Sequence, residues 1–182
     1  SDAERILDEV RKLVEDSKRH LDENLKRTAE LSKRSKEYAE ENLDRTRRLA
    51  KEAADIARRG DKADEVLTRL EELLERSERN VRRLIEENEE LLRESEENVR
   101  RNIKESEELL RKVERLIDES RLPEKVKEDL KRLLDEIRKE NKRAEDAHRD
   151  LARRSREELE KAERKHKELV DRIRKALEEI KK

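Results

Sequence analysis

The chain has 182 residues, of which 57% are charged and only 30% are hydrophobic. It contains one Gly, one Pro, one aromatic residue and no Cys. This composition excludes turn-rich folds such as β-sandwiches and Rossmann domains, and it excludes disulfide frameworks and thiolate metal sites. The 51 basic and 52 acidic residues nearly cancel, so no bulk field would attract nucleic acid or an anionic membrane.

Uncharged residues in the first third of the chain recur with an 18-residue period. Two of the columns are Leu7, Leu25, Leu43 and Leu13, Leu31, Leu49. One such repeat makes five turns at 3.6 residues per turn, so the pattern predicts a straight amphipathic helix over residues 2–59. Ser1 with Glu4 is typical of a capping box, and Gly60 of the left-handed residue that ends a helix.

The same template predicts two further helices, over residues 62–120 and 123–181. Their columns include Leu73, Leu91, Leu109 and Leu133, Leu151, Leu169. Asp61 is expected to cap the second helix, and Pro123 to be the first residue of the third. Two short connections make neighbouring helices antiparallel. The sequence therefore predicts an all-α fold, a long, straight, antiparallel up-down-up three-helix bundle, forming a single domain over 1–182.

The neutral polar residues, except Ser1 and Thr68, lie on the same stripes as the apolar ones. All seven Asn and all three His follow this rule, and the stripes carry no charged residue. Because burying a polar group without a partner costs about 1–3 kcal/mol, we infer that these groups are buried and bond one another. The predicted buried polar network comprises Ser17, His20, Asn24, Thr28, Ser32, Ser35, Tyr38, Asn42, Thr46, Ser77, Asn80, Asn88, Ser95, Asn98, Asn102, Ser106, Asn141, His148, Ser155 and His166.

Antiparallel register arithmetic sorts these residues into layers. The expected groups are Asn42, Asn80 and His166; His20, Asn102 and Asn141 with Ser17 and Ser106 within about a turn; Asn24, Asn98 and His148; and Ser32, Ser35, Asn88 and Ser155. Each histidine then meets an asparagine of a neighbouring helix, which would satisfy both ring nitrogens. For Ser17 or Ser32 the alternative is a hydroxyl bonded to its own helix.

Two roles suit such layers. Satisfied polar layers fix helix register and pairing, because a slipped bundle would leave the groups unpaired. Alternatively, protonation of buried histidines could open the bundle in acid, as in a pH switch. A catalytic or metal role is not expected, because no carboxylate lies on a stripe and His148 and His166 are about 27 Å apart along one helix. We expect no enzyme activity and no cofactor.

The 18-residue repeat, the near-equal helices, the minimal loops and the layered Asn with His20, His148 and His166 together resemble de novo designed three-helix bundles with hydrogen-bond networks. The resemblance covers the whole chain. It implies a structural scaffold with no natural biochemical activity, or a platform for hetero-oligomers or switches. A natural spectrin-like coiled-coil spacer is the remote alternative, but its heptads and aromatic anchors are missing.

The expected partners follow from the stripes. If the three helices pack on one another, every stripe is used and no apolar groove remains, so we expect a monomer that needs no partner. A domain-swapped or helix-exchange oligomer is the alternative. No apolar run approaches the roughly 18 residues of a membrane span, and no targeting signal is present, so the localisation is unknown.

Overall fold

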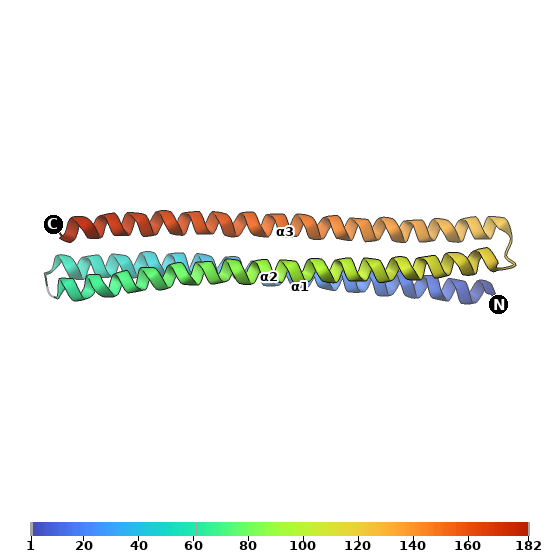
Figure 1. Cartoon of the computed structure of the whole chain (residues 1–182), viewed down its shortest axis with the longest axis horizontal. Helices are drawn as coiled ribbons and strands as arrows, with labels where there is room; N and C mark the ends of the chain where they lie inside the picture. The colour runs from blue at the N-terminus through green and yellow to red at the C-terminus, as the bar shows by residue number, and fades with distance from the viewer. Residues whose placement is uncertain (1, 61, 182) are drawn as a thin grey trace. The chain divides into compact units, whose positions relative to one another are not determined.

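The fold, described by a computed structural model for residues 2–60 and 62–181, consists of three helices joined by two short loops (Figure 1). Helix α1 spans Asp2–Arg58, α2 spans Ala63–Glu119 and α3 spans Glu124–Lys181. The described residues contain no strand. The predicted all-α, three-helix fold is confirmed, and each predicted helix boundary lies within one residue of the observed one.

The first loop reverses the chain at two residues with positive φ. The backbone N–H of Gly60 donates to the carbonyl of Ala57 at 3.1 Å, and Gly60 has a φ of 83°. This left-handed conformation is the one predicted to end the helix, because glycine has no Cβ to clash. Lys62 also adopts a positive φ, of 54°. The capping roles predicted for Ser1 and Asp61 fall outside the described residues.

The second loop ends α2 at a serine and begins α3 after the proline. The backbone N–H and the side-chain Oγ of Ser120 both donate to the carbonyl of Ile117, at 3.2 and 2.6 Å. Pro123 precedes the first residue of α3, and its carbonyl accepts the N–H of Lys127 at 3.1 Å. Proline suits this position because a helix start has no acceptor for its backbone N–H.

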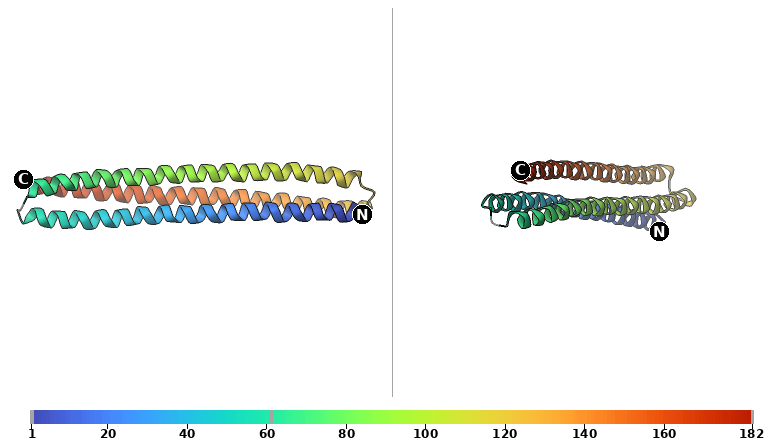
Figure 2. Two further views of the ribbon diagram at one scale, coloured as in Figure 1. Left: turned by 90° about the horizontal axis from the view of Figure 1, so that it is seen from below. Right: turned by 60° about the vertical axis from the view of Figure 1, so that its left-hand side comes forward.

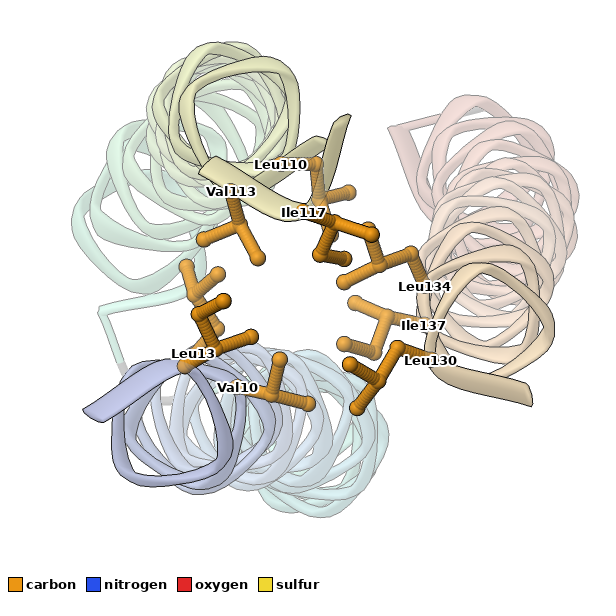
Figure 3. Packing of buried hydrophobic residues seen from close by; sticks show 9 residues of the cluster. Val10, Leu13, Leu110, Val113, Ile117, Leu130, Leu134 and Ile137 are labelled. Atoms are coloured by element: carbon orange, nitrogen blue, oxygen red, sulfur yellow. The ribbon is translucent and has the colours of Figure 1, made fainter. Parts of the chain in front are cut away.

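The helices divide between two compact units, each of which contains part of all three. Unit 1 comprises residues 1–30 and 92–152, and unit 2 comprises residues 31–91 and 153–182. The core of unit 1 converges from three helix faces (Figure 3) and consists of Ile6, Val10, Leu13, Leu110, Val113, Ile117, Leu130, Leu134 and Ile137. The core of unit 2 consists of Ala50, Ala57, Leu67, Leu70, Leu74, Val170 and Leu177.

Helix directions inside each unit follow from the side-chain contacts. In unit 1, Ser17 contacts Asn141, Asn141 contacts Ser106, and further along α1 Asn24 contacts Ser95. As α1 advances, its partners on α2 therefore retreat, so the two helices are antiparallel. In unit 2 the Gly60 loop likewise turns α2 back along α1 (Figure 2).

Ion pairs repeat along the seam between α2 and α3. In unit 2, Arg156 bonds Glu89 at 2.8 Å, and Arg174 lies 3.6 Å from Glu71 and 2.8 Å from Glu78. In unit 1, Arg138 bonds Glu107 and Glu114, at 3.2 and 2.6 Å. Successive arginines lie one 18-residue repeat apart on α3, and so do their first glutamates on α2. The repeat that orders the core therefore also orders the charged rim.

Candidate functional site

Ser77 is the centre of a hydrogen-bond network that joins all three helices in unit 2. Its Oγ lies 3.1 Å from Nδ2 of Asn42, 2.7 Å from Oγ1 of Thr46 and 2.5 Å from Nε2 of His166. Thr46 also donates to the backbone carbonyl of Asn42 at 2.7 Å. All four side chains are buried. We call this group the Ser77 tetrad.

Counting protons assigns the donors within the Ser77 tetrad. Thr46 has one hydroxyl proton, which goes to the carbonyl of Asn42, so Thr46 accepts from Ser77. Ser77 then accepts from Asn42 and from His166, which uses both of its lone pairs. His166 is therefore protonated at Nε2, and it donates through this atom whether the ring is neutral or cationic.

Unit 1 contains the same arrangement around Ser95. Its Oγ lies 3.0 Å from Nδ2 of Asn24, 2.7 Å from Oγ1 of Thr28 and 2.6 Å from Nε2 of His148. Thr28 donates to the carbonyl of Asn24 at 2.7 Å. Each member of this Ser95 tetrad is one 18-residue repeat away from its counterpart in the Ser77 tetrad, so the polar network repeats with the helix template.

A third copy of this 18-residue template has apolar residues at the tetrad positions. This third copy consists of residues of the unit 1 core. One repeat before Asn24, Thr28 and His148 lie Ile6, Val10 and Leu130, respectively. One repeat after Ser95 lies Val113. Polar and apolar versions of one packing layer thus occur in the same chain. The tetrads are therefore a substitution within a regular core and not a separate site added to it.

Two smaller networks each link the three helices within one unit. In unit 1, Ser17 donates to Oδ1 of Asn141 at 2.9 Å, and Nδ2 of Asn141 donates to Ser106 at 3.0 Å. In unit 2, Ser155 bonds Ser32 and accepts from Nδ2 of Asn88 at 2.9 Å. Oδ1 of Asn88 is buried and has no hydrogen-bond partner among the described residues.

The twenty predicted network residues fall into three classes of exposure. Twelve are buried, namely Thr28, Ser32, Asn42, Thr46, Ser77, Asn88, Ser95, Ser106, Asn141, His148, Ser155 and His166. Ser17, Asn24, Ser35, Asn80 and Asn102 are half-buried. His20, Asn98 and Tyr38 are exposed, Tyr38 by 56%. Burial was the wrong expectation for these three, because they lie at the edge of their stripes and not at the centre.

Two of the four predicted layers, those of His166 and His148, contain the correct Asn of α1 and the correct His of α3 but the wrong residue of α2. Asn42 and His166 meet Ser77, not Asn80, and Asn24 and His148 meet Ser95. Asn80 and Asn98 follow Ser77 and Ser95 by three residues. A step of three residues changes the direction in which a side chain leaves the helix by about 60°, so both asparagines lie to the side of the core axis. The sequence signal that could have identified Ser77 and Ser95 is their 18-residue column. This column continues to Val113, an apolar residue that is buried.

Two further layer assignments also need correction. His20 and Asn102 do not join Asn141; with Asn24 and Asn98 they line a recess of about 250 Å³ at the α1–α2 edge of unit 1. Ser35 does not join Ser155, because its Oγ donates to the carbonyl of Leu31 in its own helix, at 3.3 Å. Own-helix bonding, considered for Ser17 and Ser32, is thus found at Ser35 instead.

Burial governs the electrostatics of His166. Desolvation lowers the pKa of His166 below its ordinary 6.5, and the nearby Glu78 carboxylate opposes this shift. Among the described residues, no group of three or more His, Cys, Asp or Glu side chains could hold a metal ion. In the same part of the chain, no helix is long and apolar enough to cross a membrane. The tetrads provide hydrogen bonds between the three helices of each unit.

The comparisons with known proteins agree with the fold. No protein-family model matches the chain, and no curated protein matches it in sequence. A solved structure described as a computationally designed three-helix bundle matches 98% of this chain and 88% of its own, with a TM-score of 0.54 and 17% identity. The chain therefore has a three-helix bundle fold similar to that of a designed protein.

Proposed function

We propose that this chain is a designed structural scaffold whose buried hydrogen-bond networks specify helix register and pairing. The observation that carries the proposal is the duplicated tetrad. In each unit, one buried serine of α2 satisfies a donor from α1 and a histidine from α3. The similarity to a computationally designed bundle supports a designed origin.

Register specificity follows from the geometry of the tetrads. Sliding α2 by one residue turns its side chains by about 100°, which would remove Ser77 from Asn42, Thr46 and His166. Each buried polar group left without a partner costs about 1–3 kcal/mol. An apolar layer such as that of Ile6 and Val113 has no such directional penalty. The polar layers therefore select one register, while the apolar layers supply most of the stability.

The test replaces the tetrad residues by the residues that the chain itself has at the same positions of its apolar copy of the template. The variant carries Asn24→Ile, Thr28→Val, Ser95→Val, His148→Leu, Asn42→Ile, Thr46→Val, Ser77→Val and His166→Leu. To remove the two smaller networks as well, it also carries Ser17→Ala, Ser32→Val, Asn88→Leu, Ser106→Leu, Asn141→Leu and Ser155→Ile, which are the apolar residues of the same 18-residue columns. We expect a rise in unfolding free energy of about 1–4 kcal/mol. We also expect more than one amide NMR signal for many residues, because several registers become populated.

The matched control converts only the Ser77 tetrad and keeps the Ser95 tetrad. It should give one signal for each amide, because the remaining polar layers still penalise slippage. A single sharp signal set in the variant without any of the four networks would contradict the proposal, since the register would then be fixed without buried hydrogen bonds between helices.

A second candidate is a pH-responsive or helix-exchange module. The observation that favours it is that burial lowers the pKa of His166. The charged groups that line the recess beside His166 are Glu78, Arg82, Glu163, Lys167, Asp171 and Arg174. The proton count argues for a graded response and against a full switch, because protonation at Nδ1 leaves the bond from Nε2 to Ser77 intact.

A further inference from the structure

A groove of about 680 Å³ opens between α1 and α3 in unit 1. Its lining includes Val14, Leu21 and Leu25 from α1 and Leu133, Ile137 and Ala144 from α3. Leu21 and Ile137 are also buried core residues. The groove is thus continuous with the packed interior, which corrects the expectation that three packed helices would leave no apolar groove.

Exposed aliphatic side chains cluster along the same two helices. The described part of the chain has seven exposed large hydrophobic side chains, and four of them lie on α1 and α3 in unit 1. Leu7 and Val14 are 37% and 41% exposed, and they share a helix face because they lie seven residues apart. Val126 and Leu133 have the same spacing on α3 and are 39% and 42% exposed. An apolar cluster of this kind on so charged a chain marks an interaction surface.

The charges that line the groove suit contact with an identical surface. Lys18, Lys139 and Arg143 face the groove together with Asp22, Glu136 and Glu140. A twofold contact must be self-complementary, since each residue meets a copy of its own neighbourhood. Equal numbers of both signs satisfy this requirement, whereas a face of one sign would repel itself. The net charge of −1 adds no long-range repulsion between copies.

The size of the face is sufficient for a weak dimer. From Leu7 to Leu25, α1 extends about 27 Å at 1.5 Å per residue. Two helices side by side, each about 10 Å across, offer on the order of 500 Å² of surface per copy. Two copies would together bury about 1,000 Å², which is the lower limit for a specific interface.

We infer that the α1–α3 face of unit 1 binds a second copy of this chain and forms a twofold dimer. Leu7, Val14, Val126 and Leu133 of each copy pack into the groove of the other. This inference replaces the expected monomer by a concentration-dependent dimer. The register-specifying role of the tetrads does not depend on it, because neither tetrad serine nor its α1 partners line the groove.

The test is solution mass by light scattering from about 1 µM to about 1 mM, the range in which weak complexes dissociate. We expect the mass to rise from 22.0 kDa toward twice that value. The variant Leu133→Lys should stay at the monomer mass throughout. The matched control is Leu109→Lys, since Leu109 is 44% exposed on α2 of the same unit, and it should dimerise like the parent chain.

Two outcomes would overturn the inference. One is a parent chain that stays at 22.0 kDa over the whole range. The other is equal behaviour of the Leu133→Lys and Leu109→Lys variants, which would place the contact elsewhere. Circular dichroism checks that both variants keep their helix content, and Val14→Lys provides a second substitution in the face if Leu133→Lys unfolds.

Discussion

At the residue scale, a small hydroxyl does more to join the helices than the larger polar side chains near it. Ser77 and Ser95 are 3% exposed and lie at the core axis, so each reaches both neighbouring helices. Asn80 and Asn98 have more hydrogen-bonding groups, but they lie toward the edge of the helix stripe. Position relative to the axis, more than the number of donors, therefore decides which side chains connect the bundle.

Removing the Ser77 hydroxyl tests this conclusion. The substitution Ser77→Ala removes the Oγ that bonds Asn42, Thr46 and His166. Asn42 keeps its bond to the Ser77 carbonyl and Thr46 its bond to the Asn42 carbonyl, so the main loss is the partner of the His166 ring, and we expect the unfolding free energy to fall by about 1–3 kcal/mol. The measurement is chemical denaturation at neutral pH. Ser35→Ala is the control, because the half-buried Ser35 hydroxyl donates to the carbonyl of Leu31 in its own helix, and it should change stability by about 0.5 kcal/mol or less. Equal losses in the two variants would count against the tetrad as a unit.

The lowered pKa of His166 predicts a pH dependence of stability. A histidine with a lowered folded-state pKa binds more protons when unfolded, so its contribution is complete above the unfolded value of about 6.5 and is lost as the pH falls through the folded value. We expect His166→Gln to reduce the loss of stability between neutral pH and about pH 5. His20→Gln should leave that loss unchanged, since His20 is exposed. Parallel pH profiles for parent and His166→Gln would contradict this assignment.

At the scale of elements, the sequence could predict the helices well because each boundary has a local chemical cause. Gly60 supplies a positive φ, and Pro123 lacks the N–H that a helix start cannot satisfy. The sequence did not indicate the positive φ of Lys62, because lysine has no preference for that backbone conformation. The 18-residue period indicated the helix faces directly, and the antiparallel register then placed the Asn and the His of each tetrad in one layer.

The choice of α2 residue could not be read from the period alone. A stripe wide enough to contact two neighbouring helices places Ser77 and Asn80 on the same face, and only the packing of all three helices decides which one reaches the axis. The groove between α1 and α3 was missed for a related reason. Stripe width indicates that a helix has neighbours on two sides, but it does not say how closely two helices without a connecting loop approach each other.

At the scale of the whole molecule, the two units share the same three helices. α1, α2 and α3 each contribute residues to unit 1 and to unit 2. Unfolding one unit alone would require all three helices to end within the chain, and helix formation is cooperative along a continuous helix. We therefore propose that residues 1–182 fold as a single cooperative domain, even though contacts concentrate in two units.

The chain contains a natural pair of probes for this proposal, because His148 lies in unit 1 and His166 in unit 2, and both are buried. Their ring proton NMR signals should disappear at the same denaturant concentration, and this midpoint should match the loss of helical circular dichroism. In Ser77→Ala, whose altered residue lies in unit 2, the His148 signal should shift to the same lower midpoint as the helical signal. A His148 midpoint that stays at the parent value would instead show that unit 1 unfolds independently, because the lost hydrogen bonds would then destabilise only the unit that contains them.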